Sequence, residues 1–155
     1  MAIDNIKQRL AAAGVAAAFP LIVAYEGTKQ TAYLDPVSIP TICRGHTGGV
    51  QLGQTATMAQ CDDLTVQDLL KARAAIDSCV HVPLNDNQRA AFASFTFNVG
   101  GAKFCKSSAA RKLNAGDPVG ACNELPKWVY AGDKVLPGLV KRRAAERDLC
   151  LKVPT

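Results

Sequence analysis

Two carboxylates lie close together near the N-terminal end of the chain, at Glu26 and Asp35. Thr41 follows six residues after Asp35, and a Gly45-His46 step comes soon after Thr41. Cleavage of a glycosidic bond needs two carboxyl groups, one to protonate the leaving oxygen and one to activate water or stabilise the sugar cation. We therefore interpret Glu26 as the general acid, Asp35 as the second carboxylate, and Thr41 as the hydroxyl that positions the water.

The neighbouring residues predict different surroundings for the two carboxylates. Glu26 follows the apolar run 19–25, and burial among apolar groups raises the pKa of a carboxyl group, which suits an acid. Gly27 is expected to end the preceding helix in a left-handed conformation, with Glu26 at the mouth of a cleft. Asp35 precedes Pro36 in a turn-like segment, where it should stay solvated and ionised. The alternative is two unrelated surface acids.

The same residues resemble the active-site motif of the phage-type lysozymes, the endolysins of glycoside hydrolase family 24. That motif runs Glu, eight residues, Asp, five residues, Thr and then Gly-His, and it reads here without a gap. The similarity continues through residues 91–100, Trp128 and residues 138–146. The resemblance implies hydrolysis of the β-1,4 bond between N-acetylmuramic acid and N-acetylglucosamine in peptidoglycan, for host cell lysis, with no cofactor.

The pattern of helices and strands predicts a mostly helical α+β domain over residues 26–155, and the resemblance implies that it has the two lobes of a lysozyme-like fold. Short β-like stretches around 31–34 and 39–44 form a small β-lobe that carries Asp35 and Thr41. A capping box at Thr57 opens a long helix that should reach about Ser78 and connect this lobe to a helical C-terminal lobe. Further helices are expected from Asn85 to about Val99, from Ser107 or Ser108 to Leu113, from Asp117 onward, and from Leu139 to Cys150.

Four more residues are candidates for substrate binding: His46, Asn98, Arg142 and Arg143. His46 is expected to orient its loop by hydrogen bonds, and the alternative is a metal ligand or an acid–base group. The Asn98 amide lies at a helix end, where it binds either a sugar acetamido group or the backbone. The family pattern implies that Arg142 or Arg143 lies near Glu26, while the other is a solvated surface charge; the sequence does not say which.

Cysteine content predicts disulfides and an oxidising compartment. The six cysteines are even in number and widely spaced: Cys43, Cys61, Cys79, Cys105, Cys122 and Cys150. There is no Cys-x-x-Cys pair and there are only two histidines, so no metal site is expected. Among many allowed pairings we favour Cys43–Cys61 and Cys122–Cys150, which leaves Cys79–Cys105. Six buried thiols in a cytoplasmic protein are the alternative.

Residues 1–25 form an N-terminal segment with a basic start and an apolar stretch over 10–25. It resembles a signal sequence and is short for a membrane span. Many family members have Gly where this chain has Cys43, and a Cys there resembles the exported, signal-arrest-release subset. In that subset an uncleaved segment directs secretion, rests transiently in the inner membrane and then leaves it. This implies a periplasmic enzyme; the alternatives are an ordinary packed helix and release from the cytoplasm through a holin.

Basic residues gather toward the C-terminus. Residues 1–100 carry 7 Lys or Arg and 8 Asp or Glu, whereas residues 101–155 carry 11 and 5. Such asymmetry indicates a polyanionic partner, or a solvated face that aids solubility. Nucleic acid is not expected, because no binding motif is present and aromatic residues make up only 6% of the chain. We expect a monomer that acts on peptidoglycan. A lytic transglycosylase and a non-catalytic wall-binding module are the other functions considered.

Overall fold

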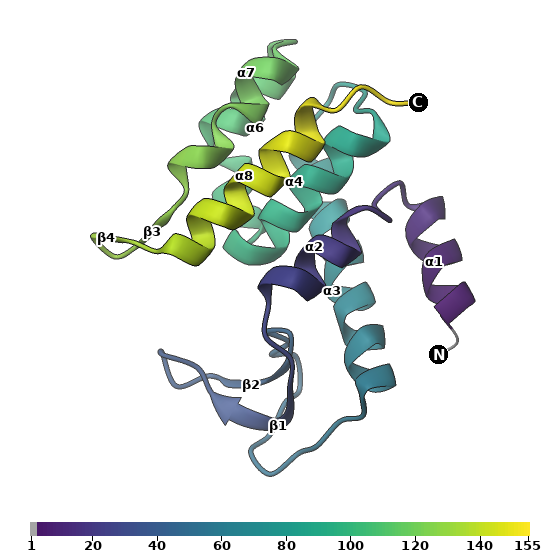
Figure 1. Cartoon of the computed structure of the whole chain (residues 1–155), viewed down its shortest axis with the longest axis vertical. Helices are drawn as coiled ribbons and strands as arrows, with labels where there is room; N and C mark the ends of the chain where they lie inside the picture. The colour runs from purple at the N-terminus through teal and green to yellow at the C-terminus, as the bar shows by residue number, and fades with distance from the viewer. Residues whose placement is uncertain (1–2) are drawn as a thin grey trace.

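The structure is a computed structural model that describes residues 3–155. Figure 1 shows a small lobe built on β1 and β2, a larger helical lobe centred on α4 and α8, and α3 running between the two. The elements in chain order are α1 (Ile3–Ala12), α2 (Ala18–Tyr25), β1 (Lys29–Leu34), β2 (Pro40–Cys43), α3 (Met58–Cys79), α4 (Asp86–Val99), α5 (Gly101–Cys105), α6 (Ser108–Asn114), α7 (Pro118–Cys122), the 3-10 helix η1 (Leu125–Lys127), β3 (Tyr130–Ala131), β4 (Lys134–Val135) and α8 (Pro137–Leu151). The predicted α+β, mostly helical and lysozyme-like class is confirmed.

The small lobe is a twisted β-hairpin with its own core. β1 pairs antiparallel with β2, and Tyr33 lies opposite Thr41 in the register. A compact apolar cluster forms beneath it from Ile42, Val50 and the two half-cystines Cys43 and Cys61. Because Cys61 belongs to α3, this cluster fastens the hairpin to the connecting helix.

The connecting helix α3 begins where the sequence predicts it. The Thr57 side chain accepts from the backbone N–H of Gln60 while the Gln60 side chain accepts from the backbone N–H of Thr57, which completes a capping box. One face is buried along the whole helix, at Cys61, Thr65, Val66, Leu69, Ala72 and Ile76. The first turns pack on the β-lobe and the later turns on the main core. One rigid element therefore spans both lobes.

The helical lobe is packed around α4. Seven consecutive residues of α4, Ala90–Thr96, are buried, because α3, α8 and α2 cover it from different sides. The ring of Phe95 lies 5.2 Å from that of Trp128, measured between centroids, and 6.4 Å from that of Phe104. Aromatic pairs at these separations strengthen a core beyond their buried area. Trp128 is thus part of the packing of this lobe.

The apolar N-terminal segment forms two helices that join the main core. Gly14 adopts a positive φ of 68° and interrupts the helical path between α1 and α2. Leu10, Val15, Ala18 and Ile22 are all buried in the main cluster. Among the described residues there is no helix with the length and apolar character needed to cross a bilayer.

Three disulfides link successive parts of the fold. Cys43–Cys61 joins β2 to α3, Cys79–Cys105 joins α3 to α5, and Cys122–Cys150 joins α7 to α8. These are the three pairs favoured from the sequence. Each closes a loop of 18 to 28 residues, for which the chain-entropy account gives a stabilisation of about 3–4 kcal/mol.

Several short elements were not expected from the sequence. Gly100, at a φ of 92°, ends α4 as predicted. Gly101 was expected to belong to the same helix end, but it is the first residue of the short helix α5. The hairpin β3–β4 is only two residues deep on each side, too short to leave a periodic pattern. Helix α8 begins at Pro137, two residues before the predicted start, because proline is favoured in the first turn of a helix.

Candidate active site

Glu26 lies in the short link between α2 and β1, at the junction of the two lobes. Its backbone N–H closes the last turn of α2 on the carbonyl of Ile22, at 2.8 Å. The side chain is 25% exposed, and its Oε1 accepts a hydrogen bond of 2.7 Å from Nη1 of Arg142. The carboxylate therefore has a guanidinium partner in addition to the apolar run that precedes it in the chain. The prediction that Gly27 is left-handed is wrong, since the chain leaves the helix at Glu26 itself, in an extended conformation.

Both candidate arginines are buried, so the idea that one of them is a surface charge is also wrong. Arg142 donates from Nη2 to the carbonyl of Ser94, at 3.1 Å, and from Nε to Glu146, at 3.3 Å. Arg143 donates from Nη1 to the other oxygen of Glu146, at 2.5 Å, and from Nε to the carbonyl of Trp128. These contacts lock both guanidinium groups against α4 and α8.

Glu146 is the functional neighbour that the sequence analysis missed. Its side chain has no exposed surface, and it also accepts from the hydroxyl of Ser94, at 2.7 Å. An acid three and four residues after two arginines lies on the same helix face as both of them, and this spacing was the available signal. Glu146 thus holds Arg142 in the position from which it reaches Glu26.

The cluster joins two guanidinium groups, of Arg142 and Arg143, to two carboxyl groups, of Glu26 and Glu146. Burial lowers the pKa of the Arg143 guanidinium, and Glu146 opposes that shift. Arginine stays charged in proteins because its ordinary pKa is so high. Each guanidinium group therefore has a carboxyl partner within the cluster.

Asp35 organises the turn between β1 and β2. Its Oδ1 accepts from the backbone N–H of Val37, at 2.9 Å, and of Ile39, at 2.8 Å. Its Oδ2 has no hydrogen-bond donor among the described residues. One carboxylate oxygen therefore fixes the turn, and the other is left for a ligand or water.

Thr41 shares this turn with Asp35. The Thr41 hydroxyl donates to the carbonyl of Ile39, at 2.8 Å, and the same carbonyl accepts from the backbone N–H of Asp35, at 3.0 Å. Since its hydrogen is used, the Thr41 oxygen can act toward water only as an acceptor. This suits a water whose other hydrogen points to a carboxylate.

His46 and Asn98 are held by protein partners. Nδ1 of His46 lies 2.8 Å from Oδ2 of Asp68, and Nε2 lies 3.0 Å from the carbonyl oxygen of Gly48. This geometry ties the loop after β2 to α3. Asn98 accepts at Oδ1 from Nη2 of Arg143 and keeps its amide NH₂ group free of that contact. Within residues 3–155 no group of three or more His, Cys, Asp or Glu side chains is placed to hold a metal ion.

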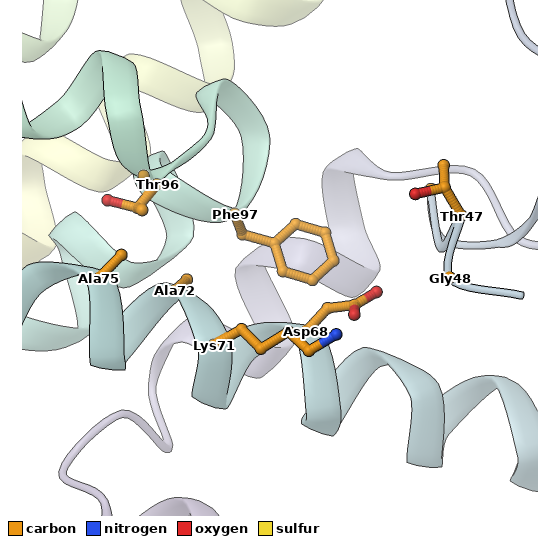
Figure 2. Close-up of a pocket in the computed structure, with 10 residues that line it drawn as sticks. Thr47, Gly48, Asp68, Lys71, Ala72, Ala75, Thr96 and Phe97 are labelled. Atoms are coloured by element: carbon orange, nitrogen blue, oxygen red, sulfur yellow. The ribbon is translucent and has the colours of Figure 1, made fainter. Parts of the chain in front are cut away.

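A groove of about 350 Å³ runs between the lobes, with α3 as its floor. Figure 2 shows Thr47 and Gly48 on one wall, Thr96 and Phe97 on the other, and Asp68 and Lys71 below. The Thr96 hydroxyl is buried without a hydrogen-bond partner in the described chain. Glu26, Asp35 and Thr41 are not among the residues that line this groove.

Comparison with known proteins decides the family. The profile of the family described as phage lysozyme matches residues 23–146. The chain belongs to the phage lysozyme family. It is 39% identical over 148 residues to the SAR-endolysin of Pseudomonas phage phiKMV, covering 92% of this chain and 91% of that one. This phage lysozyme is therefore a glycoside hydrolase, an endolysin that cleaves peptidoglycan in host cell lysis.

Solved structures of phage lysozyme type agree with the fold. The muramidase domain of SpmX from Asticaccaulis excentricus superposes with a TM-score of 0.84 at 35% identity, covering 88% of this chain and 96% of that one. The active form of P1 phage endolysin Lyz gives a TM-score of 0.80 at 28% identity, covering 97% and 94%. A transglycosylase and a non-catalytic wall-binding module are not favoured by these similarities. The likeness to SAR-endolysins fits export to the periplasm.

Proposed function

We propose that this lysozyme hydrolyses the β-1,4 bond between N-acetylmuramic acid and N-acetylglucosamine with Glu26 as the general acid. The carboxyl group of Glu26 would give its proton to the glycosidic oxygen as the bond to the sugar breaks. Its partly exposed side chain at the junction of the lobes, in the link between α2 and β1, supports this role. Arg142 would fix the orientation of the carboxyl group before and after the transfer.

Asp35 is proposed as the second carboxylate and Thr41 as the residue that positions water. The oxygen of Asp35 that has no protein donor would accept a proton from the water, or face the positive charge of the sugar. The Thr41 oxygen would accept the second hydrogen of the same water. The observation that carries this proposal is the shared turn, in which the carbonyl of Ile39 bonds to both residues.

Analysis of digestion products tests the proposed reaction. Purified sacculi treated with the protein should give reducing muramic acid ends, detected by mass spectrometry, and anhydro-muramic ends would instead show a transglycosylase. Glu26→Gln keeps the size of the side chain and removes the proton donor, so we expect turnover to fall about 10³-fold or more with an unchanged circular dichroism spectrum. Asp148→Asn, an exposed change on α8, is the matched control. Substantial turnover by Glu26→Gln would refute the assignment of the acid.

We also infer that residues 1–25 act as the export segment and associate transiently with the inner membrane. The likeness to SAR-endolysins supports this inference, and the break at Gly14 divides the segment into two short helices in the folded enzyme. Fractionation of expressing cells tests it: the full chain should appear first with membranes and later in the periplasm, without cleavage. A protein found only in the cytoplasm would exclude export.

We expect the released enzyme to be a monomer, which its sedimentation coefficient would report.

A further inference from the structure

Arg44 is a buried arginine that the proposed reaction does not use. It follows β2 directly in the chain, and only 3% of its surface is exposed. Burial of a guanidinium group costs free energy unless hydrogen bonds and a carboxylate compensate for it. The partners of Arg44 therefore show which parts of the fold its side chain holds together.

One partner of Arg44 lies in the link that carries Glu26. Nε of Arg44 donates a hydrogen bond to the hydroxyl oxygen of Thr28, at 3.0 Å. Thr28 comes two residues after Glu26 in the chain. Since Lys29 pairs with Cys43, Thr28 and Arg44 are the next two residues beyond the end of the β1–β2 ladder. This bond ties down the chain between Glu26 and β1.

The other partners of Arg44 lie on α3. Its Nη1 donates to Oδ1 of Asp62, at 2.7 Å, and to the hydroxyl oxygen of Thr65, at 3.2 Å. The Thr65 hydroxyl in turn donates to the carbonyl of Cys61, at 2.8 Å. Cys61 forms the disulfide with Cys43, which precedes Arg44 in the chain. The guanidinium group is therefore anchored to the connecting helix, and this anchor fixes the direction in which Nε points.

The chain passes between the two lobes at the link 26–28 and again along α3 (Figure 1). Gly27, in the middle of the link, has no packing that could hold it. A Cβ atom placed there would have no atom of the described chain within 4 Å apart from its chain neighbours. Arg44 binds both connections, through Thr28 and through Asp62. It thus fixes the link against α3 at the base of the β-lobe.

We infer that Arg44 is a positioning residue for the glycosidase reaction, because through Thr28 it sets the place of Glu26 relative to the β-lobe that carries Asp35. The inference rests on the proposed roles of these two carboxyl groups. Among the contacts of the described chain, Arg44 reaches neither of them, so it acts through the backbone of the link. The two carboxyl groups must lie at a set separation around the bond that breaks. Loss of the contact between Arg44 and Thr28 should therefore slow the chemical step rather than weaken substrate binding.

Thr28→Val tests the inference most directly, because it removes the acceptor, keeps the size of the side chain and leaves the bonds from Arg44 to α3 in place. We expect kcat for the release of reducing ends from solubilised strands to fall about 10-fold, with KM within about 2-fold of the wild type. Thr28→Ser keeps the hydroxyl group and should keep the wild-type kcat. Thr31→Val, the same change at an exposed residue of β1, is the matched control and should leave both constants unchanged.

Arg44→Lys tests the same contact from its other side. Lysine keeps the positive charge beside Asp62, but a single compact ammonium group does not reproduce the separate donors Nε and Nη1. We expect this variant also to lose about 10-fold in kcat. Thr28→Val added to Arg44→Lys should cause no further loss, because both changes remove one contact. Should Thr28→Val fail to fold, which its thermal unfolding would report, Arg44→Lys beside Thr28→Ser carries the test.

Three results would overturn the inference: an unchanged kcat in Thr28→Val or Arg44→Lys, a rise in KM alone, or an equal loss of kcat in Thr28→Ser. Losses that multiply in the double variant would overturn it too, since they would mean that the two residues act separately. Substantial turnover by Glu26→Gln would instead refute the proposed acid. Inactive Glu26→Gln beside fully active Thr28→Val would refute only the role of Arg44.

Discussion

Nη1 of Arg142 lies 2.7 Å from Oε1 of Glu26, across a separation of 116 residues in the chain. This contact brings the first part of the fold and its last helix together at the proposed acid. Because Arg142 is itself held by Glu146 and by the carbonyl of Ser94, the orientation of Glu26 depends on groups deep in the helical lobe. The acid is positioned by the packing of α8 on α4.

Arg142→Gln should lower turnover, because it removes the hydrogen bond that holds the carboxyl group of Glu26 in one orientation. Misplacement of a reacting group by about 1 Å can cost about 100-fold, so we expect kcat to fall about 10- to 100-fold. The measurement is the release of reducing ends from solubilised strands. Arg147→Gln, on the same helix, is the control, and an unchanged kcat in Arg142→Gln would argue against positioning of the acid by this arginine.

Glu146→Gln should destabilise the fold by about 3–5 kcal/mol, because it replaces the one carboxylate shared by two buried guanidinium groups with a neutral amide. Urea unfolding followed by circular dichroism measures the loss directly. Asp148→Asn changes an exposed carboxylate two residues away and should stay within about 0.5 kcal/mol of the wild type. Equal stability of the two variants would mean that Glu146 is not the anchor of the arginines.

Asp35→Asn should lower turnover about 100-fold or more while leaving stability nearly unchanged. The amide oxygen can still accept from the backbone N–H groups of Val37 and Ile39, so the turn is kept, but the negative charge is lost. Reducing-end release and thermal unfolding are measured together. Loss of stability in parallel with activity would show that Asp35 serves the turn rather than the reaction.

The ion pairs of Glu124 predict a pH-dependent contribution to stability. Hydrogen bonds from Lys112, and then from Lys127, lower the pKa of this carboxyl group. A lowered folded-state pKa gives stability that is complete above the unfolded value and is lost as pH falls through the folded one. Glu124→Gln should therefore cost about 1 kcal/mol at neutral pH, since both lysines are largely solvated.

The difference between wild type and Glu124→Gln should shrink as the solution becomes acidic. Urea midpoints measured from pH 7 down to the range in which carboxyl groups protonate would show this convergence. A difference that stays constant across that range would mean that packing rather than charge accounts for it.

Local signals in the sequence predicted most of the helical framework. Side-chain caps at Thr57, Asn85 and Asp117 mark helix starts because each satisfies backbone N–H groups with its own atoms. The two helices of the N-terminal segment were not separated, because a single Gly14 among alanines is a weak signal. The hairpin β3–β4 was not predicted either, because strands of two residues are too short to show a periodic pattern.

The candidate site was predictable in its residue types but not in its contacts. The spacing of Glu26, Asp35 and Thr41 pointed to two-carboxylate chemistry, since all three are near in sequence. The partner of Glu26 comes from the other end of the chain, and no local pattern distinguishes Arg142 from Arg143. Glu146 was overlooked because burial of a charged side chain becomes visible only when α8 is packed on α4.

The enclosure of Glu146 between two guanidinium groups has an evolutionary consequence. Substitution of either arginine, or of the glutamate, leaves an uncompensated charge in the interior. Proteins that carry only one of these substitutions would therefore fold poorly. Selection for folding alone would then preserve the trio. In a prophage copy that is no longer under selection for lysis, we expect Glu26 to be substituted before these three positions are. The result would be an inactive protein that keeps the buried ion pairs of the active enzyme.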